Sequence, residues 1–315
     1  MTCTIKWNVL TFSEWKQRFN QIRRSTLLQS YPYAQAQSAL HNQKPRWGLI
    51  EINGQEAGLV QIMEAGLFKN IFHAIIIDRG PLWFNGFGTL EHMRGFAGAL
   101  QREFPARFGR RRRFMPEMES GAALGTILTE AGFKPQAAKP YETIWIDLTK
   151  SEDIWLKNLK SGWRGALRKA QKCGITIEWD DSGAHFPWLM KNYLIDKEEK
   201  NYDGPSLPLL TSLARYFIPN KEMMIGRALI DGKPIAGILL LCHGGAATYQ
   251  IGWSSQKGRE TAAHHLLLWE ALCVLQAKGL TDFDLGGVNE DTAKGVKKFK
   301  SGMGGELVHI SGLYS

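Results

Sequence analysis

Two hydrophobic patterns alternate along the chain. Short segments of alternating or continuous apolar residues are followed by longer segments in which apolar residues recur three and four positions apart. The first pattern predicts β-strands and the second predicts amphipathic helices. Because the two patterns follow each other almost throughout, the sequence predicts an α/β protein with mixed sheets.

Two segments share the pattern of a β-hairpin. Strands are predicted within 46–63 and within 223–242, and each pair is interrupted by a two-residue turn, Asn-Gly at 53–54 and Asp-Gly at 231–232. These dipeptides are strong hairpin signals because both residues tolerate positive φ angles. The recurrence favours two related domains.

Each hairpin is followed by further strand, an amphipathic helix and another strand. The helices are predicted at 88–104 and 260–278. A single apolar stripe on the second helix predicts core packing; it consists of Leu267, Leu268, Ala271, Leu272 and Leu275. With a boundary near 149, the expected domains are 1–148 and 149–302, and 303–315 is expected to join the first.

Composition agrees with two domains and adds a charge bias. The 315 residues are 44% apolar, too many for one compact core. A formal net charge of +9 favours a polyanionic partner such as nucleic acid or a phosphorylated substrate. The cysteines are far apart without a CxxC pair, which argues against a metal site or disulfide framework; they are Cys3, Cys173, Cys242 and Cys273.

No targeting signal is recognisable at the start of the chain. The N-terminal residues lack the apolar run and cleavage site of a signal peptide, so a cytoplasmic location is expected. The most apolar stretch, 235–242, is far shorter than the ~20 residues of a membrane-spanning helix. Stable membrane insertion is therefore not expected, and contact with a membrane would be peripheral.

Two basic segments are candidates for phosphate contact. A helix predicted over 152–172 would place Lys157, Lys160, Arg164 and Arg168 on one face, where like charges repel unless an anion meets them. A solvated face is the alternative. The arginines at 110–113 precede a predicted strand at 114–118 and could contact phosphates or only solvate a loop.

The segment 280–306 has the densest pattern. A strand at 281–285 runs into two glycines, a basic helix follows, and further glycines come after it. The five glycines on either side of this helix permit close approach of the backbone to a ligand. Neither GxxxxGK[ST] nor GxGxxG occurs in the required context, so no nucleotide cofactor and no metal is indicated.

This tail, FDLGG followed by KKFKSGMGGE, resembles the C-terminal signature of the Fem (FemABX) aminoacyltransferases. Other segments agree with it in the same order: IDRGPLW at 77–83, WRGALRKAQKCGITIEW at 163–179, ATYQIGWSS at 247–255 and LLLWEAL at 266–272. The resemblance implies two tandem domains of the GNAT (acyl-CoA N-acyltransferase-like) fold. It also implies transfer of an amino acid from aminoacyl-tRNA to an amine of a UDP-linked or lipid-linked peptidoglycan precursor.

The resemblance also implies roles for individual residues. Lys300 is expected to stabilise the tetrahedral oxyanion or the ribose leaving group, with Asp78 and Tyr249 as further catalytic candidates. Candidates for substrate contact are Tyr33, Gln37, Arg164, Lys169, Tyr216, Asp284, Phe299 and Glu306. Candidates for tRNA contact are Arg110, Arg111, Lys157, Lys160, Arg168, Lys297 and Lys298.

One segment departs from the Fem pattern, and rival functions remain. Family members often have a tryptophan and, four residues later, a lysine where this chain has Tyr33 and Gln37. Either the acceptor is not linked through a diphosphate, or another cation such as Lys44 or Arg46 substitutes for the lysine. A CoA-dependent N-acyltransferase is the first rival, but the segment 254–262 lacks its pyrophosphate motif. A Fem-like enzyme acting on another peptide and a basic RNA-binding protein are the others.

Overall fold

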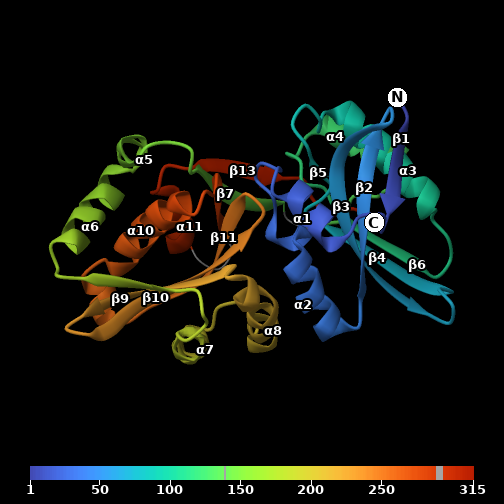
Figure 1. The fold of residues 1–315 in the computed structure, drawn as a ribbon. Coiled ribbons are helices and arrows are strands. Elements are labelled where there is room, and N and C mark those ends of the chain that lie inside the picture. Colours follow the sequence, from blue (N-terminus) through green and yellow to red (C-terminus); the bar gives the residue numbers. More distant parts are fainter. Residues whose placement is uncertain (138–139, 289–293) are drawn as a thin grey trace. The chain divides into compact units, whose positions relative to one another are not determined.

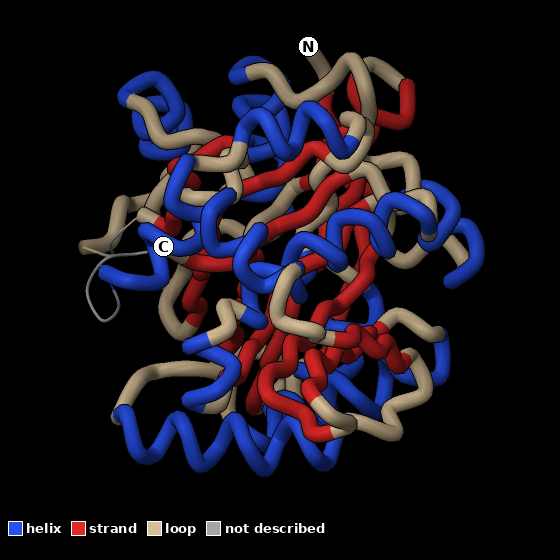
Figure 2. The backbone as a smooth tube through the Cα atoms, turned by 90° about the vertical axis from the view of Figure 1, so that its left-hand side faces the viewer, coloured by secondary structure: helices blue, strands red, loops and turns tan. Residues whose placement is uncertain are grey.

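The computed structural model describes residues 1–137, 140–288 and 294–315, which form two units. The first unit comprises Met1–Glu142 together with Val308–Ser315, and the second comprises Thr143–Leu307. Each unit is built on a mixed sheet with helices packed against it (Figures 1 and 2). None of the described helices combines the length and apolar character needed to cross a membrane.

The first unit contains a six-stranded sheet of order β1-β2-β3-β4-β6, with β5 paired to β3. Its strands are β1 Cys3–Trp7, β2 Lys44–Ile52, β3 Gln55–Leu67, β4 Phe72–Asp78, β5 Leu82–Trp83 and β6 Arg110–Met115. Its helices are α1 Phe12–Phe19, α2 Tyr31–His41, α3 Leu90–Glu103 and α4 Ala122–Glu130, with a 3₁₀ turn at Leu27–Gln29.

Both faces of this sheet are buried. Successive side chains of a strand point to opposite faces, so Leu49 and Ile50 of β2 enter different clusters. Ile50 packs in a cluster with Phe96 of α3, whereas Leu49 packs in a cluster with Trp15 of α1. The sheet is therefore held between α3 with α4 on one face and α1 on the other.

The second unit carries a seven-stranded sheet of order β13-β7-β12-β11-β10-β9-β8, whose edge strand β13 continues into the segment Val308–Ser315. Its strands are β7 Tyr141–Asp147, β8 Thr176–Asp180, β9 Met223–Ile230, β10 Lys233–His243, β11 Ala246–Ser254, β12 Asp282–Gly287 and β13 Glu306–Ile310. Its helices are α5 Glu152–Asn158, α6 Ser161–Gln171, α7 Phe186–Lys200, α8 Leu207–Phe217, α9 Gln256–Glu260, α10 Ala263–Ala277 and α11 Lys294–Ser301, with a 3₁₀ turn at Ile218–Asn220.

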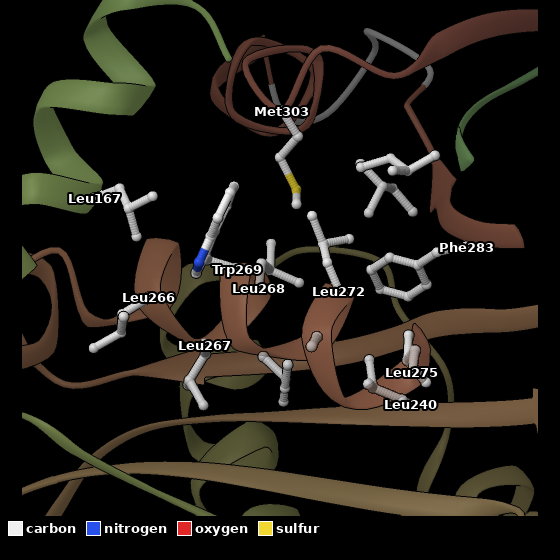
Figure 3. Packing of buried hydrophobic residues seen from close by; sticks show 14 of the residues in the cluster. Leu167, Leu240, Leu266, Leu267, Leu268, Trp269, Leu272, Leu275, Phe283 and Met303 are labelled. Carbon is white, nitrogen blue, oxygen red and sulfur yellow. The ribbon is translucent and has the colours of Figure 1, made fainter. Parts of the chain in front are cut away.

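Helix α10 forms the centre of the second core. The predicted apolar stripe is buried in the same cluster as Leu240 of β10 and Phe283 of β12, and Figure 3 shows Leu275 beside both. Met303, which follows α11, joins the same cluster. The helix thus connects the sheet to the segment that carries Lys300.

The two units repeat one topology, as the hairpin pattern predicts. Hairpin β2–β3 leads through β4 and α3 to β6, and hairpin β9–β10 leads through β11 and α10 to β12. In both units the strands joined through the helix are parallel. The hairpin turns at 53–54 and 231–232 have positive φ at both positions, which explains the Asn-Gly and Asp-Gly sequences.

The helix predicted over 152–172 is wrong, because the chain breaks there into α5 and α6. Leu159 and Lys160 between them have extended backbones. The Lys160 amide donates to the carbonyl oxygen of Gly302 at 2.9 Å, a bond that a continuous helix would not allow. The four cations therefore do not form one helical stripe.

The strand predicted at 114–118 is also misplaced, since the arginines at 110–113 themselves form most of β6. Arg110 and Arg112 extend over the rings of Phe104 and Phe133, at 5.9 and 4.4 Å from the ring centroids. Arg111 and Arg113 alternate with them and are exposed. Aromatic rings and backbone carbonyls thus accommodate two arginines that the sequence alone assigns to a loop.

Candidate active site

The central feature of the second unit is the divergence of two parallel strands. Strands β11 and β12 pair only over Ala246–Thr248 and Asp282–Asp284. Beyond that point the pairing of β12 with β7 becomes irregular, and Gly286 has a φ of +71°. A bulge with a left-handed glycine bends a strand, so this irregularity separates β12 from β11. In the first unit the equivalent parallel pair, β4 and β6, stays in register along six residues.

Asp284 stabilises this bulge through hydrogen bonds. Its Oδ1 accepts the Gly286 amide at 2.8 Å and a hydrogen bond from the Thr143 hydroxyl. The side chain is buried, with 1% of the residue exposed. These contacts make Asp284 a positioning residue; the substrate contact expected for it stays a prediction.

Two adjoining cavities lie where the strands separate. One of about 550 Å³ is lined by residues from α7, the segment after it, β11 and β12, and one of about 360 Å³ by residues from β11, α9, α10 and α11. Both are lined by Tyr249, Gly252 and Lys300. The residues predicted from the tail motif and from the β11 segment are therefore brought together.

Lys300 lies at this junction with its side chain almost entirely buried. Its Nζ donates to the carbonyl oxygen of Gly287 at 3.0 Å and lies 5.3 Å from the centroid of the Tyr249 ring. Burial lowers the pKa of Lys300 to about 8, against the opposing effect of the Asp284 carboxylate. An ammonium has three donors and Gly287 uses one, so donors are left for an anionic group in the cavity.

A hydrogen-bonded histidine, which the motif analysis did not assign to the site, completes the junction. The Tyr249 hydroxyl and His264 Nε2 are 2.9 Å apart, and Nδ1 of the same ring is 3.3 Å from the Ser254 hydroxyl. Burial, with His265 and Lys300 nearby, lowers the pKa of His264 to about 4, so the ring is neutral at pH 7. Burial raises the pKa of Tyr249, which keeps its hydroxyl protonated.

Further cavity residues come from α7 and the segment after it. Asp196, Lys200 and Tyr202 line the larger cavity, and Lys200 forms an ion pair with Asp196. No local motif marks them, because they approach Lys300 only through folding. Among the described residues, no cluster of His, Cys, Asp and Glu is arranged to hold a metal ion.

The glycines after α11 pack against protein rather than against an open site. A Cβ on Gly302 would lie 2.6 Å from the Trp163 ring, and one on Gly304 would lie 2.1 Å from the carbonyl oxygen of Asn158. These glycines therefore allow close packing against α5 and α6, and not the close approach to a ligand that the sequence predicts. This packing fixes the end of α11 and, with it, the position of Lys300.

Phe299, Tyr216 and Glu306 differ in their relation to the cavities. Phe299 packs against His264, His265 and Trp163, with ring centroids 5.6, 4.9 and 6.2 Å away, and also lines the smaller cavity. Tyr216 on α8 is outside both linings, and Glu306 is exposed at the start of β13. The structure therefore brings Phe299 to Lys300 but neither of the other two.

A separate cavity of about 410 Å³ lies in the first unit. It is lined by Tyr33, Gln37, Asp78 and Arg113, among others. The Gln37 amide donates to the Tyr33 hydroxyl at 2.9 Å, and Arg113 Nε lies 3.2 Å from Asp78 Oδ1. Burial raises the pKa of Asp78, and the Arg113 charge opposes this. Tyr33, Gln37 and Asp78 thus share one polar cavity.

The cation at this cavity is Arg113, not one of the two suggested substitutes. Arg46 forms ion pairs with Glu64 and Glu103 at 3.4 and 2.9 Å and lies over the Trp7 ring. Neither Lys44 nor Arg46 is among the residues that line the cavity. The alternation of side chains along β6, which the sequence analysis did not anticipate, turns Arg113 toward Asp78.

The cations of the α5–α6 region are exposed except for Arg164. Its Nη2 donates to the carbonyl oxygens of Lys157 and Leu159, both at 3.0 Å, and so caps the end of α5. The exposed group consists of Lys157, Lys160, Arg168 and Lys169, and Lys298 on α11 is exposed as well. Lys297 is half-buried. A phosphate role for Arg164 would compete with this capping role.

Replacing Arg164 with alanine should therefore lower the free energy of unfolding. Two carbonyl oxygens would lose a charged donor, and we expect a loss of roughly 1–2 kcal/mol at this half-exposed position. Urea unfolding measures it, with Lys160→Ala as the exposed control, for which a change within about 0.5 kcal/mol is expected. Unchanged stability together with weaker RNA binding would instead assign Arg164 to phosphate contact.

Comparison with known proteins identifies the fold to which this geometry belongs. Residues 157–301 match the acetyltransferase (GNAT) domain family. A crystal structure of FemX is similar over 98% of this chain and 96% of its own, with a TM-score of 0.81 and 16% identity. No curated protein sequence matches the chain.

Two further solved structures are similar at lower TM-scores. The C-terminal domain of a protein named as a lysylphosphatidylglycerol synthetase from Agrobacterium fabrum has a TM-score of 0.55 and 16% identity, with 96% of this chain and 92% of that domain covered. A tandem GNAT protein from the clavulanic acid biosynthesis pathway has a TM-score of 0.50 and 13% identity, covering 98% and 97%. The predicted fold class of two tandem GNAT-like domains is confirmed.

Proposed function

We propose that this protein, a GNAT-type transferase with the tandem-domain fold of FemX, moves an amino acid from aminoacyl-tRNA to an amine of a peptidoglycan precursor. The observation that carries the proposal is the buried Lys300 at the separation of β11 and β12, within a tail that resembles the Fem signature. A buried ammonium is costly unless an anion forms beside it. Acyl transfer supplies that anion.

The reaction requires a cation where negative charge develops. The acceptor amine attacks the ester carbon that joins the amino acid to the terminal ribose, and a tetrahedral intermediate with a negative oxygen forms. The ester C–O bond then breaks, an amide forms, and the ribose oxygen takes up a proton as the amine nitrogen loses one. A preorganised donor such as Lys300 stabilises the intermediate without reorganisation.

In the turn where a CoA-dependent relative would hold pyrophosphate, one backbone amide is already bonded within this chain. The Gly258 amide at the start of α9 donates to the Ser255 hydroxyl at 3.1 Å. A Cβ on Gly258 would lie 2.3 Å from the carbonyl oxygen of Ile235, so this glycine serves close packing. Fewer free amides remain for a pyrophosphate, which favours an RNA-linked donor over a coenzyme.

The cavity of the first unit is the candidate site for the acceptor. Its hydroxyl and amide side chains, Tyr33 and Gln37, suit the peptide part of a precursor, and its cation Arg113 is paired with Asp78. A cation paired in this way is less available to a diphosphate. An acceptor of another peptide class is therefore the alternative within the same reaction.

A transfer assay tests the proposal. Purified protein is incubated with a mixture of charged tRNAs and either UDP-linked or lipid-linked muropeptide, and the acceptor is analysed by mass spectrometry. We expect a gain of one amino-acid residue that RNase treatment abolishes. The GNAT family match favours CoA-dependent acyl transfer as the second candidate. Turnover of an acyl-CoA without transfer from any charged tRNA would establish it instead.

Tyr249→Phe should slow the reaction moderately. The substitution keeps the ring beside Lys300 but removes the hydroxyl bonded to His264, so the neutral imidazole loses a partner. We expect the turnover number to fall roughly tenfold, the usual scale for one hydrogen bond. Tyr216→Phe, outside the cavities, is the matched control and should keep full activity. Equal activity of both variants would mean that Tyr249 contributes only packing and that its hydroxyl has no role in the reaction.

A further inference from the structure

One end of the first unit exposes a group of large apolar side chains. Phe108 is 88% exposed, Phe68 74%, Leu67 66%, Ile71 57% and Phe72 48%. Four of them belong to the β3–β4 hairpin, in which Leu67 ends β3, Phe68 and Ile71 lie in the turn and Phe72 begins β4; Phe108 belongs to the loop that leads into β6 (Figure 1). A contiguous exposed apolar patch marks an interaction surface more often than a scattered set does.

These side chains form one surface, here called the hairpin tip. The rings of Phe68 and Phe72 and those of Phe72 and Phe108 are each 6.4 Å apart. Arg107 joins the two loops, because its guanidinium donates to the carbonyl oxygens of Asn70, of Ile71 at 2.8 Å and of Phe108 at 3.0 Å. The backbone that carries the tip is thus held in place while its apolar side chains face solvent.

The two segments that carry the hairpin tip are basic, and the acidic residues that precede them, Glu64 and Glu103, both form ion pairs with Arg46. The segments 65–77 and 104–116 contain no aspartate or glutamate, whereas Lys69, Arg107 and the arginines at 110–113 all lie in them. A groove of about 500 Å³ along β6 is lined by these arginines from Arg107 onward. An apolar patch surrounded by cations is complementary to a surface with an anionic outer layer and an apolar interior.

We propose that the hairpin tip docks on a membrane surface that contains anionic lipids. The apolar side chains would enter the headgroup region, and the exposed Lys69 and Arg111 would meet lipid phosphates. Single-stranded RNA also binds protein surfaces that combine cations with aromatic rings. The aliphatic side chains of Leu67 and Ile71, however, cannot stack on bases as aromatic rings do. The proposal is independent of which acyl donor the enzyme uses.

Vesicle sedimentation tests this surface on the full chain. The protein is mixed with vesicles of phosphatidylcholine alone and with vesicles that also contain phosphatidylglycerol, at low and high salt. We expect binding to the anionic vesicles, weakened by salt. Phe68→Ser combined with Phe108→Ser should reduce the affinity at least roughly tenfold, because two apolar anchors are lost while every charge is kept.

Val9→Ser is the matched control, since Val9 is 56% exposed elsewhere in the first unit. It should bind vesicles as the wild type does, and circular dichroism should show that all variants are folded. Wild-type protein that ignores anionic vesicles would overturn the proposal, as would a double variant that binds them normally. A double variant that loses binding to tRNA, or self-association, instead of vesicle binding would assign the tip to RNA or to a second copy.

Discussion

Lys300→Ala should reduce the turnover number by roughly 10²–10³-fold and leave the KM for the acceptor nearly unchanged. Lys300 is the cation at the separation of β11 and β12, and its Nζ is held by Gly287 at 3.0 Å. Its charge matters most when the tetrahedral oxygen becomes negative, so its loss affects the transition state more than ground-state binding. Steady-state kinetics with saturating donor separate the two quantities.

Lys298→Ala is the matched control for this prediction. Lys298 lies two residues away on α11 but is exposed, so its removal leaves the buried charge intact. It should retain the wild-type turnover number, with at most a salt-dependent change in donor binding. If Lys300→Ala raised the KM and left the turnover number unchanged, Lys300 would be a binding residue.

The pH dependence follows from the same lysine. Its pKa of about 8 means that the ammonium form, which stabilises an oxyanion, is lost as the pH rises through that value. The turnover number should therefore fall above about pH 8. Lys300→Arg, which stays charged at all accessible pH values, should remove this descending limb even if its activity is lower.

The repeated fold could be predicted because its signals are local. The turns at 53–54 and 231–232 require positive φ at adjacent residues, and the sequence places Asn-Gly and Asp-Gly there. The stripe on α10 follows the helical period and is buried accordingly. Such features depend on neighbours a few residues apart, which a sequence displays directly.

The break between α5 and α6 could not be predicted from local pattern. It depends on the Lys160 amide bonding to Gly302 and on Gly304 packing against Asn158, contacts between segments far apart in the chain. The strand predicted at 114–118, which the structure places at Arg110–Met115, is misplaced for the same reason. Its arginines are accommodated by the rings of Phe104 and Phe133, and polarity alone does not indicate those partners.

The candidate site was only partly accessible from sequence. The resemblance of the tail identifies Lys300, and the β11 segment identifies Tyr249, which the structure places 5.3 Å from its Nζ. The sequence does not assign His264 and Asp196 to the site. Each lies in a helix, and nothing in the local pattern distinguishes it from other helical residues. Only the separation of β11 from β12 at the bulge brings them into one cavity.

Lys300→Met should make the protein more stable at neutral pH. Burial lowers the pKa of Lys300 from its ordinary 10.5 to about 8, which corresponds to about 3 kcal/mol against the charged form in the folded state. Methionine fills a similar volume without a charge, so the variant should gain up to about 3 kcal/mol in the free energy of unfolding at pH 7. Urea unfolding of both proteins measures the difference.

The pH dependence of that gain distinguishes it from better packing. Between about pH 8 and 10.5 the unfolded chain keeps the Lys300 proton and the folded chain has released it, so wild-type stability rises with pH relative to the variant. The advantage of Lys300→Met should therefore shrink across this window. Lys298→Met, at an exposed position, should show neither the gain nor the trend. A constant advantage at every pH would mean that folding does not lower the pKa of Lys300 and that the gain comes from better packing alone.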